Sequence, residues 1–339
     1  MLRIGIVGWG FMGKMHFRCY KSDTNVEVTA ICDADAKQLQ NSSGVSGNIS
    51  GAEDDLDLSN IALYSDLSKM LAEEKLDALS IASPTFLHAS QTIEALNAGV
   101  HVFCEKPMAL NSGDCREMTE VAKQSGMILQ IGHCIRFWPE YVQAKEIIDS
   151  QKYGKVLAAT FQRLSLTPTW SWDNCFLDGK RSGGAMLDLH IHDTDYVQYV
   201  FGMPKEVFSR GVIGPSGEFD HTVTQYLYGN ACVITAEGGW IMAPGFGFEM
   251  SFKIMLEKAT LVYSSAQEPT FRIFPIDGET IIPEIPTGDG YSFEIQHFVD
   301  TLSGKAVPSI ITPEQSGDSV KIIEAEKESI RNNDKISLL

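Results

Sequence analysis

Lys106 lies at a position in the sequence where a residue could bind a ligand. The run Val100–Cys104 is apolar and rich in β-forming residues, which predicts a strand inside a sheet. The tripeptide Glu105-Lys106-Pro107 follows at once, and Pro107 ends the strand because it fixes φ and lacks an N–H. A lysine at the carboxyl end of a sheet strand lies where open α/β sheets bind ligands. The alternative is a lysine in a solvated turn.

Asp188 and His192 form a second candidate group. Residues four apart share one face of an α-helix, so the Asp188 carboxylate could orient the His192 ring to accept a proton near neutral pH. His190 would point almost opposite, and the chain has no further His or Cys cluster, so we expect no metal site. A His192 that only forms hydrogen bonds in the core remains an alternative.

A glycine-rich loop supplies a third element, because Gly8-Trp9-Gly10-Phe11-Met12-Gly13 follows the first predicted strand and opens a helix. The spacing GxGxxG in this context is typical of dinucleotide binding. Gly8 permits the tight turn, Gly10 lets the backbone approach a pyrophosphate, and Gly13 lets the helix pack against the strand. The amides at the helix start, which Phe11 and Met12 help to provide, would hold the anion.

Asp33 ends the second predicted strand, where this fingerprint expects an acid for the adenosine ribose hydroxyls. A carboxylate there repels the 2′-phosphate of NADP, and the next residues, Ala34 and Asp35, do not offset that repulsion. The charge pattern therefore predicts NAD as the cofactor, with NADP disfavoured.

The elements that must position these residues alternate between strand and helix patterns in the first half of the chain, which predicts a doubly wound parallel sheet. The predicted strands are Arg3–Val7, Val26–Cys32, Ala78–Ala82, Val100–Cys104 and Met127–Ile131, and the predicted helices are Phe11–Ser22, Ser65–Glu74, Leu87–Ala98 and Ser112–Gln124. The polar stretch 41–60 shows neither the helical nor the strand periodicity and is expected to be a surface insertion.

The pattern changes after residue 155 to alternating β runs joined by short turns, with one helix predicted over Gly184–Phe201. We therefore expect two domains, residues 1–125 and 126–339. The fold class is α/β: an N-terminal Rossmann domain, then an α/β domain with a large, mostly antiparallel open sheet. The C-terminal helices could pack back on the first domain.

Composition narrows the function classes. The formal charge of −17 argues against nucleic acid or an anionic membrane as partner, and no apolar run is long enough to span a bilayer. A strand begins at once, which predicts no signal peptide. The seven cysteines are scattered singly, so neither a disulfide framework nor a zinc cluster is indicated. We expect a cytoplasmic protein.

Together these motifs resemble the glucose–fructose oxidoreductase / inositol dehydrogenase (Gfo/Idh/MocA) family nearly end to end. The residues that carry the resemblance are the GxGxxG loop with His16, Ala82-Ser83-Pro84-Thr85 with His88, Glu105-Lys106-Pro107, Arg136-Phe137 before Pro139, Gly183-Gly184 with Asp188, His192 and Asp195, and Ala325 with Glu328-Ser329-Ile330. Many relatives have Gly where this chain has His190, which puts a bulkier group near the site.

The resemblance implies an NAD-dependent dehydrogenase or reductase acting on a sugar, cyclitol or related polyol. Lys106 would stabilise the reacting oxygen, His192 would be the general acid/base, and Asp188 would orient the substrate or the imidazole. Glu105 would lie by the nicotinamide ribose. The resemblance also implies that Ser83, Pro84 and His88 line the cofactor cleft, and that the open sheet forms a homodimer or homotetramer.

Four further residues are candidates for contact with substrate. Trp170 and Trp172 lie in a loop of aromatic and polar residues that would suit a sugar, although ordinary burial explains them equally. Arg136 and Arg163 could bind a carboxylate or carbonyl group, and Arg163 could instead face solvent.

Two other function classes stay open. A non-catalytic NAD-sensing regulatory protein could keep the same fold. An NAD-dependent lyase or glycosidase would borrow a hydride and return it, consuming substrate without accumulating NADH.

Overall fold

The computed structural model describes residues 1–40, 56–229 and 231–338. The chain divides into two compact units, the first formed by Met1–Cys134 with Tyr291–Gly317 and the second by Ile135–Gly290 with Asp318–Leu339. The boundary predicted after residue 125 therefore falls too early, because the last strand of the first sheet follows it.

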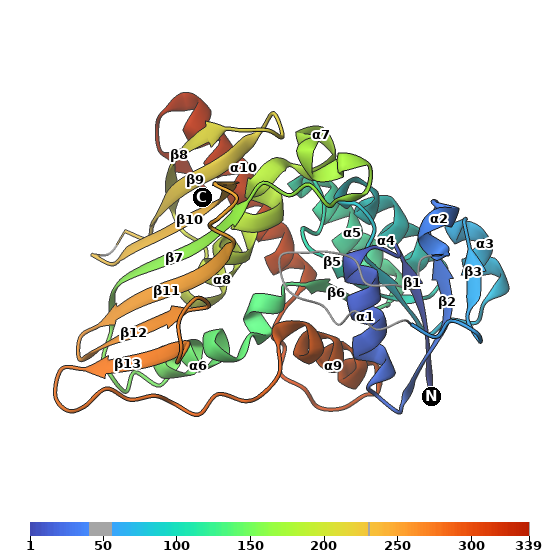
Figure 1. The fold of residues 1–339 in the computed structure, drawn as a ribbon, viewed down its shortest axis with the longest axis horizontal. Coiled ribbons are helices and arrows are strands. Elements are labelled where there is room, and N and C mark those ends of the chain that lie inside the picture. The colour runs from blue at the N-terminus through green and yellow to red at the C-terminus, as the bar shows by residue number, and fades with distance from the viewer. Residues whose placement is uncertain (41–55, 230, 339) are drawn as a thin grey trace. The chain divides into compact units, whose positions relative to one another are not determined.

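The first unit is built on a six-stranded sheet in which every neighbouring pair is parallel (Figure 1). Its strands are β1 (Leu2–Val7), β2 (Val26–Cys32), β3 (Ala62–Tyr64), β4 (Ala78–Ile81), β5 (His101–Glu105) and β6 (Leu129–Gly132). The order β3-β2-β1-β4-β5-β6 is that of a Rossmann fold and confirms the predicted fold class. The order reverses between β1 and β4, so a ligand site is expected at their carboxyl ends.

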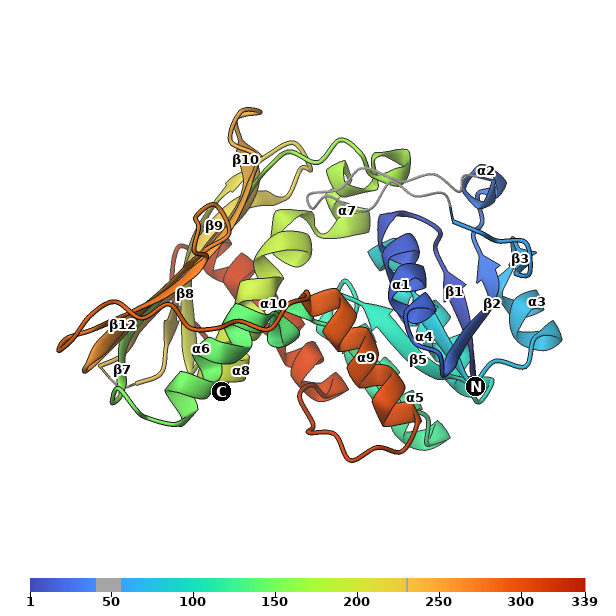
Figure 2. The same cartoon turned by 60° about the horizontal axis from the view of Figure 1, so that its bottom comes forward.

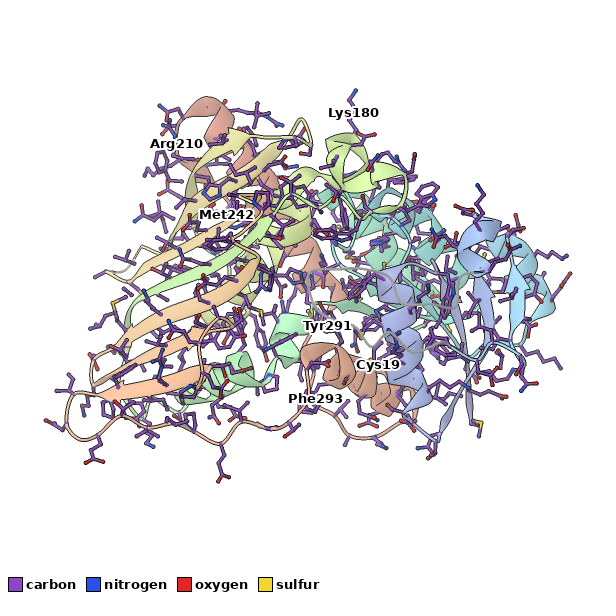
Figure 3. All side chains as sticks on the ribbon, in the orientation of Figure 1. Cys19, Lys180, Arg210, Met242, Tyr291 and Phe293 are labelled. Atoms are coloured by element: carbon purple, nitrogen blue, oxygen red, sulfur yellow. The ribbon has the colours of Figure 1, made fainter. Side chains whose placement is uncertain are left out.

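Helices supply the apolar cover that a parallel sheet needs on both faces. They are α1 (Phe11–Lys21), α2 (Ala36–Leu39), α3 (Leu67–Glu73), α4 (His88–Asn97), α5 (Ser112–Ser125) and α9 (Gly290–Leu302). Phe298 of α9 joins the core cluster that includes Trp9 and Phe17. Figure 3 shows Cys19 of α1 beside Tyr291, at the start of α9.

The polar stretch 41–60, predicted to be a surface insertion, lies mostly outside the described residues, which resume at Leu56. Leu56 and Leu58 are partly buried and pack against the first core, so the end of this stretch is anchored in the unit.

The second unit is built on an eight-stranded sheet in the order β13-β12-β11-β7-β10-β9-β8-β14. Its strands are β7 (Val156–Leu166), β8 (Glu206–Ile213), β9 (Phe219–Leu227), β10 (Val233–Met242), β11 (Phe248–Leu256), β12 (Ala259–Ser264), β13 (Phe271–Pro275) and β14 (Ile336–Ser337). All neighbours are antiparallel except β7 and β10, which run parallel. The expected large, mostly antiparallel sheet is thus confirmed.

Helices of this unit lie along one face of its sheet (Figure 2). They are α6 (Pro139–Asp149), α8 (Ile191–Phe201) and α10 (Pro313–Asn332), which enters the unit at Asp318. β7 reflects this arrangement, because Phe161 and Arg163 are buried while Thr160 and Gln162 remain partly exposed. The period of two therefore buries one face and leaves the other open.

The segment predicted as one helix over Gly184–Phe201 is divided in the structure. Met186–His190 forms a π-helix, and α8 begins only at Ile191. The short helix α7 (Gly179–Ser182) and the 3₁₀ turns Cys134–Phe137 and Trp172–Leu177 precede it. Asp188 and His192, predicted to share a face by α-helical spacing, therefore lie on either side of the junction between this π-turn and α8. Such turns occur frequently at functional sites.

Candidate active site

The glycine loop has the geometry that its spacing predicts. A Cβ on Gly8, which has a φ of +89°, would lie 2.5 Å from the carbonyl oxygen of Ala82. A Cβ on Gly13 would lie 1.9 Å from the carbonyl oxygen of Gly8, so only glycine lets α1 pack this closely. Around Gly10, by contrast, a Cβ would meet nothing within 4 Å. The loop is tight where it must pack and open where a pyrophosphate would approach.

The start of α1 can bind an anion. Gly10 caps the helix without a side chain, and the first helical bond runs from the Lys14 amide to the Gly10 carbonyl at 3.1 Å. The amides of Phe11, Met12 and Gly13 precede that bond, so helix geometry gives them no intrahelical acceptor. Their N–H groups and the helix dipole suit the phosphates of a dinucleotide.

Asp33 connects the end of β2 to this loop. Its Oδ2 accepts the Trp9 amide at 2.7 Å and its Oδ1 accepts the Asp35 amide at 2.8 Å. Asp33 is only half-buried, so its carboxylate retains access to a ligand. The same acid thus holds the loop and presents negative charge at the carboxyl edge of the sheet.

Ser83 follows β4 and His88 begins α4, but His88 does not present its ring on a cleft surface. It is 1% exposed, and its Nδ1 and Nε2 lie 2.8 and 2.9 Å from the carbonyl oxygens of Pro107 and Ser83. Burial lowers the pKa of His88, against the opposing effect of these carbonyls. His88 therefore links the residues that follow β4 to those that follow β5. Its ring does not line a cofactor cleft, contrary to what the resemblance had implied. Ser83 and Pro84 stay partly exposed there.

Glu105 is also buried, at 5% exposure, and belongs to a chain of polar contacts beneath Lys106. Its Oε1 lies 2.9 Å from His16 Nε2, and His16 Nδ1 lies 2.8 Å from Ser80 Oγ. Burial alone would raise the pKa of Glu105, but the hydrogen bond and charge of His16, with Lys106, hold it below its usual value. A Cβ on Gly132 would lie 3.2 Å from Oε1, so the glycine of β6 makes room for this carboxylate.

Lys106 is the partly exposed residue between buried Glu105 and Pro107. Its amide donates to Oε2 of Glu105 at 3.2 Å, and the Lys106–Pro107 peptide is cis. The backbone of Lys106 is thus held from one side by Glu105 and, through Pro107, from the other by His88. A lysine so fixed at a strand end can donate its ammonium hydrogens to a ligand oxygen.

Asp188 and His192 lie in the second unit, in the segment that includes the π-helix. Asp188 is partly exposed and His192 is 9% exposed, whereas the residues between them are buried. His192 Nδ1 is enclosed by protein. The Asp188 charge is near enough to contribute to the raised pKa of Cys175, for which burial is the main cause.

His190, singled out as a departure from relatives, is fully buried. Its Nε2 lies 3.1 Å from Oε2 of Glu326 and 3.5 Å from the hydroxyl of Tyr226. A Cβ on Gly238 would lie 2.7 Å from the His190 ring, so a glycine on β10 accommodates it. The ring therefore fills space between the sheet and α10, and it does not reach toward a ligand.

The two candidate arginines are both held in buried ion pairs. Arg136 binds Asp195 through Nε and a terminal nitrogen, each at 2.8 Å, and both side chains are fully buried. Arg163 binds Asp193 in the same two-point manner at 3.0 and 3.1 Å. The solvent-facing alternative for Arg163 is wrong, since it is 2% exposed. These pairs fix the first turns of α8, directly after His192, and sequence order alone does not reveal them.

Trp172 presents its ring at 45% exposure, whereas Trp170 is partly buried. The guanidinium of Arg181 lies over the Trp172 ring at 5.4 Å from its centre and binds Asp173 at 3.0 Å. Asp173 and Asn174 both have φ near +50°, an unusual backbone for residues other than glycine. An exposed indole in a well-defined turn suits the C–H face of a sugar.

Two absences hold for the described ranges. Residues 1–40, 56–229 and 231–338 contain no group of three His, Cys, Asp or Glu side chains placed to hold a metal ion. Within the same ranges, no helix is both long and apolar enough to cross a membrane.

Comparison with known proteins places these features in one family. The protein-family model described as "Oxidoreductase family, NAD-binding Rossmann fold" matches residues 2–133. A second family model, for the Gfo/Idh/MocA C-terminal domain, matches residues 141–262. The fold and the glycine loop thus define an NAD-binding oxidoreductase of Rossmann type. The chain belongs to the Gfo/Idh/MocA family, as the sequence motifs indicated.

Individual relatives differ in the activity that their names state. A 2,7-anhydro-N-acetylneuraminate hydratase of Mediterraneibacter gnavus is 33% identical over 210 residues, 61% of this chain and 51% of the hydratase. A myo-inositol 2-dehydrogenase of Thermotoga maritima is 27% identical over 279 residues, 79% of this chain and 77% of that protein. The match thus spans about half the length of the first relative.

Among solved structures, a myo-inositol 2-dehydrogenase of Lactobacillus plantarum superposes with a TM-score of 0.80 at 25% identity, covering 100% of this chain and 99% of that chain. The fold described above is therefore the fold of this family over its full length.

Proposed function

We propose that this protein is an NAD-dependent oxidoreductase that moves a hydride between the nicotinamide and a hydroxyl-bearing carbon of a sugar, cyclitol or related polyol. The observation that carries the proposal is Lys106, fixed by Glu105 and His88 at the carboxyl edge of the sheet that also holds the complete glycine loop. A dinucleotide bound at the loop and a lysine whose backbone is held at the same sheet edge would suit redox chemistry at a C–O bond.

The chain's own residues would act as follows. The amides at the start of α1 hold the pyrophosphate and Asp33 binds the adenosine ribose. Lys106 donates a hydrogen bond to the reacting oxygen and stabilises its developing negative charge. His192 accepts the hydroxyl proton at Nε2, and Asp188 orients the substrate or the imidazole. Bound nicotinamide supplies the hydride acceptor.

NAD is the preferred cofactor in this proposal, because a carboxylate at the end of the second strand, here that of Asp33, would repel the 2′-phosphate of NADP. Asp35 follows two residues later and adds a second negative charge. The side chain of Ala34 offers no compensating donor.

The names of the relatives support a polyol or sugar substrate and also support a second function. Inositol dehydrogenases suggest net oxidation, whereas the hydratase suggests a reaction in which hydride is borrowed and returned. Trp172 and Trp170 would provide the apolar surface for the sugar ring in either case.

The test is an assay of NADH formation against a panel of inositols, sugars, glycosides and sugar acids, repeated with NADP. Lys106→Met should lower kcat/KM on the order of 10²–10³-fold, as loss of an oxyanion donor does, with unchanged NADH affinity. Lys69→Met, which removes an exposed lysine of the same unit, is the control. Substrate loss without NADH would favour the hydride-borrowing function. Full activity of Lys106→Met would refute the role of Lys106.

The open face of the eight-stranded sheet is proposed to form a homodimer or homotetramer. Val212 and Val223 are 53% and 43% exposed on neighbouring strands β8 and β9, among polar residues of the same face. Val223→Lys should lower the mass measured by light scattering if this face is the interface. All seven cysteines are free thiols, which is compatible with the proposed cytoplasmic location.

A further inference from the structure

The turn that leads into the Asp188–His192 segment receives side-chain contacts from several elements of the second unit, in addition to the main-chain bond from the Gly183 amide to the Gly179 carbonyl. Gly183 and Gly184 both have left-handed backbones, with φ of +79° and +72°. A Cβ on Gly183 would lie 2.3 Å from Leu187 Cδ1, and one on Gly184 would lie 2.8 Å from Glu218 Cβ. Two glycines in sequence give this turn large conformational freedom in the absence of outside contacts.

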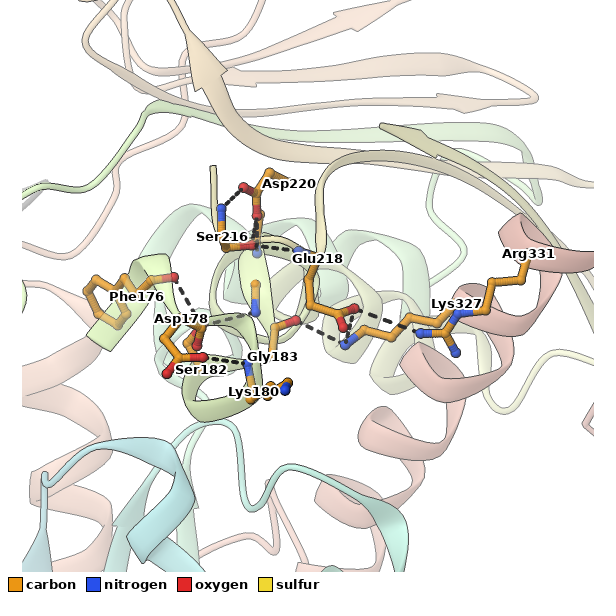
Figure 4. Close-up of polar contacts among 12 residues, drawn as sticks. Phe176, Asp178, Lys180, Ser182, Gly183, Ser216, Glu218, Asp220, Lys327 and Arg331 are labelled. Atoms are coloured by element: carbon orange, nitrogen blue, oxygen red, sulfur yellow. Dashed lines mark hydrogen bonds and ion pairs between the residues drawn. The ribbon is translucent and has the colours of Figure 1, made fainter. Parts of the chain in front are cut away.

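Lys327 of α10 holds the carbonyl side of the turn. Its Nζ donates to the Gly183 carbonyl oxygen at 3.0 Å, and Oε2 of Glu218 lies 3.7 Å from the same nitrogen (Figure 4). Arg331, one turn further along α10, approaches the same carboxylate at 3.9 Å. Burial lowers the pKa of Lys327, and Glu218 opposes that effect. A charged donor placed on a main-chain carbonyl makes a stronger bond than a neutral one.

Ser182 and Asp220 hold the amide side of the same turn. The Gly184 amide donates to Ser182 Oγ at 3.1 Å, and the Ala185 amide approaches Oδ1 of Asp220 at 3.4 Å. Asp220 is fully buried and is itself oriented by the amide and hydroxyl of Ser216. The contacts come from α7, β9 and α10, so three separate elements meet on one glycine pair.

We propose that Lys327 is a positioning residue for the Asp188–His192 segment, because it fixes the Gly183 carbonyl three residues before the π-helix begins at Met186. Asp188 follows the anchored Ala185 by only three residues, so movement of the turn is transmitted directly to it. Small errors in the placement of catalytic groups lower the rate strongly. The kinetic part of this inference rests on the proposed function, whereas the structural part does not.

The first measurement needs no substrate. Hydrogen–deuterium exchange of the peptide covering residues 183–192 is compared between the unmodified protein, Lys327→Met and Lys321→Met. Lys321 is the matched control, since it lies on the same helix and also donates to a main-chain carbonyl, that of Leu338, at 3.2 Å. We expect faster exchange in 183–192 only for Lys327→Met. Equal exchange in the two variants would overturn the proposal.

The second measurement uses the substrate panel and NAD. Lys327→Met should lower kcat on the order of tenfold to a hundredfold, with little change in NADH affinity, and Lys327→Arg should restore most of kcat. Lys321→Met should keep kcat. Unchanged kcat in Lys327→Met, or no rescue by Arg, contradicts the positioning role.

A third variant covers the case in which Lys327→Met fails to fold. Ser182→Ala removes the acceptor of the Gly184 amide and leaves the charged groups in place, and it should also speed exchange in 183–192. If the protein turns over no substrate on the panel, the proposed function fails. The hydrogen–deuterium exchange result still tests whether Lys327 positions the segment, so the two failures can be distinguished.

Discussion

The glycine loop of the first unit and the Asp188–His192 segment of the second are held in opposite ways. The loop is shaped mainly by close main-chain approaches, because a Cβ on Gly8 or Gly13 would meet the carbonyl oxygen of Ala82 or Gly8, and the Asp33 side chain adds one bond to the Trp9 amide. The segment is held by side chains distant in sequence, including Lys327 and Asp220. The ion pairs of Arg136 and Arg163 add two more such contacts just after His192.

This difference bears on how each site can change. A loop made of main-chain contacts binds a part of the cofactor that is the same for every substrate, and it tolerates little variation. A segment fixed by side chains can be moved by single substitutions outside the site. We infer that cofactor binding is the constant property of this chain and that placement of Asp188 and His192 is the adjustable one.

The largest effect is expected for Gly13→Ala. The added Cβ would lie 1.9 Å from the Gly8 carbonyl oxygen, which is main chain and cannot move aside without displacing the loop. We expect loss of measurable NADH binding by fluorescence titration. Gly183→Ala is the comparison, because its closest contact is a Leu187 side-chain atom at 2.3 Å. That variant should keep NADH binding and lose activity, and the reverse pattern would break the comparison.

Arg163→Met should be the next most severe change. It leaves the Asp193 carboxylate buried without its partner, and removing one member of a buried pair costs about 3–5 kcal/mol of unfolding free energy. Urea denaturation measures this loss. The double variant Arg163→Met/Asp193→Leu should recover part of it. A single variant as stable as the parent would show that the pair does not hold α8.

Glu105→Gln tests the network under Lys106 through its pH dependence. The folded-state pKa of Glu105 lies below its usual value, so the folded protein binds this proton less readily than the unfolded chain. The stabilisation is therefore present at neutral pH and is lost as pH falls below about 4. We expect the stability difference between parent and variant to be largest at neutral pH and to shrink in acid. A difference that grows in acid would contradict this sign.

The smallest effect is expected for Arg181→Met. Its partner Asp173 has a side chain that is 67% exposed, and an exposed ion pair contributes at most about 1 kcal/mol. Thermal unfolding should therefore change little. If Trp172 binds substrate, KM should rise while kcat stays, because the cation over the ring is lost. A large loss of stability would show that Arg181 is needed for the stability of the folded protein.

Sequence predicted the regular elements and the loop closely, because local signals specify them. The predicted strand Val26–Cys32 has the observed bounds, and GxGxxG lies where a strand meets a helix. The short strand β3 was missed, since its three residues follow a stretch with no period of either kind. The parallel pairing of β7 with β10 was missed as well, because register between distant strands leaves no local pattern.

The site was harder to predict wherever long-range contacts decide. His88 and Glu105 look like cleft residues in sequence, and only the packing of β4, β5 and α1 shows that both are buried supports. The π-helix at Met186–His190 was not predicted either, because the spacing of residues in the sequence does not distinguish it from an α-helix. Lys106, by contrast, could be selected as a candidate from the sequence, because a charged residue directly after an apolar strand is a local feature.

Transfer of hydride from substrate to the nicotinamide can be measured directly with deuterium. Polyols of the panel, deuterated at their carbinol carbons, are incubated with the protein and NAD, and the reduced cofactor is analysed by mass spectrometry. We expect one deuterium in the accumulated NADH, with the rate lowered on the order of 10²–10³-fold by Lys106→Met. Substrate turnover without deuterated NADH, or an unchanged rate in Lys106→Met, would contradict it.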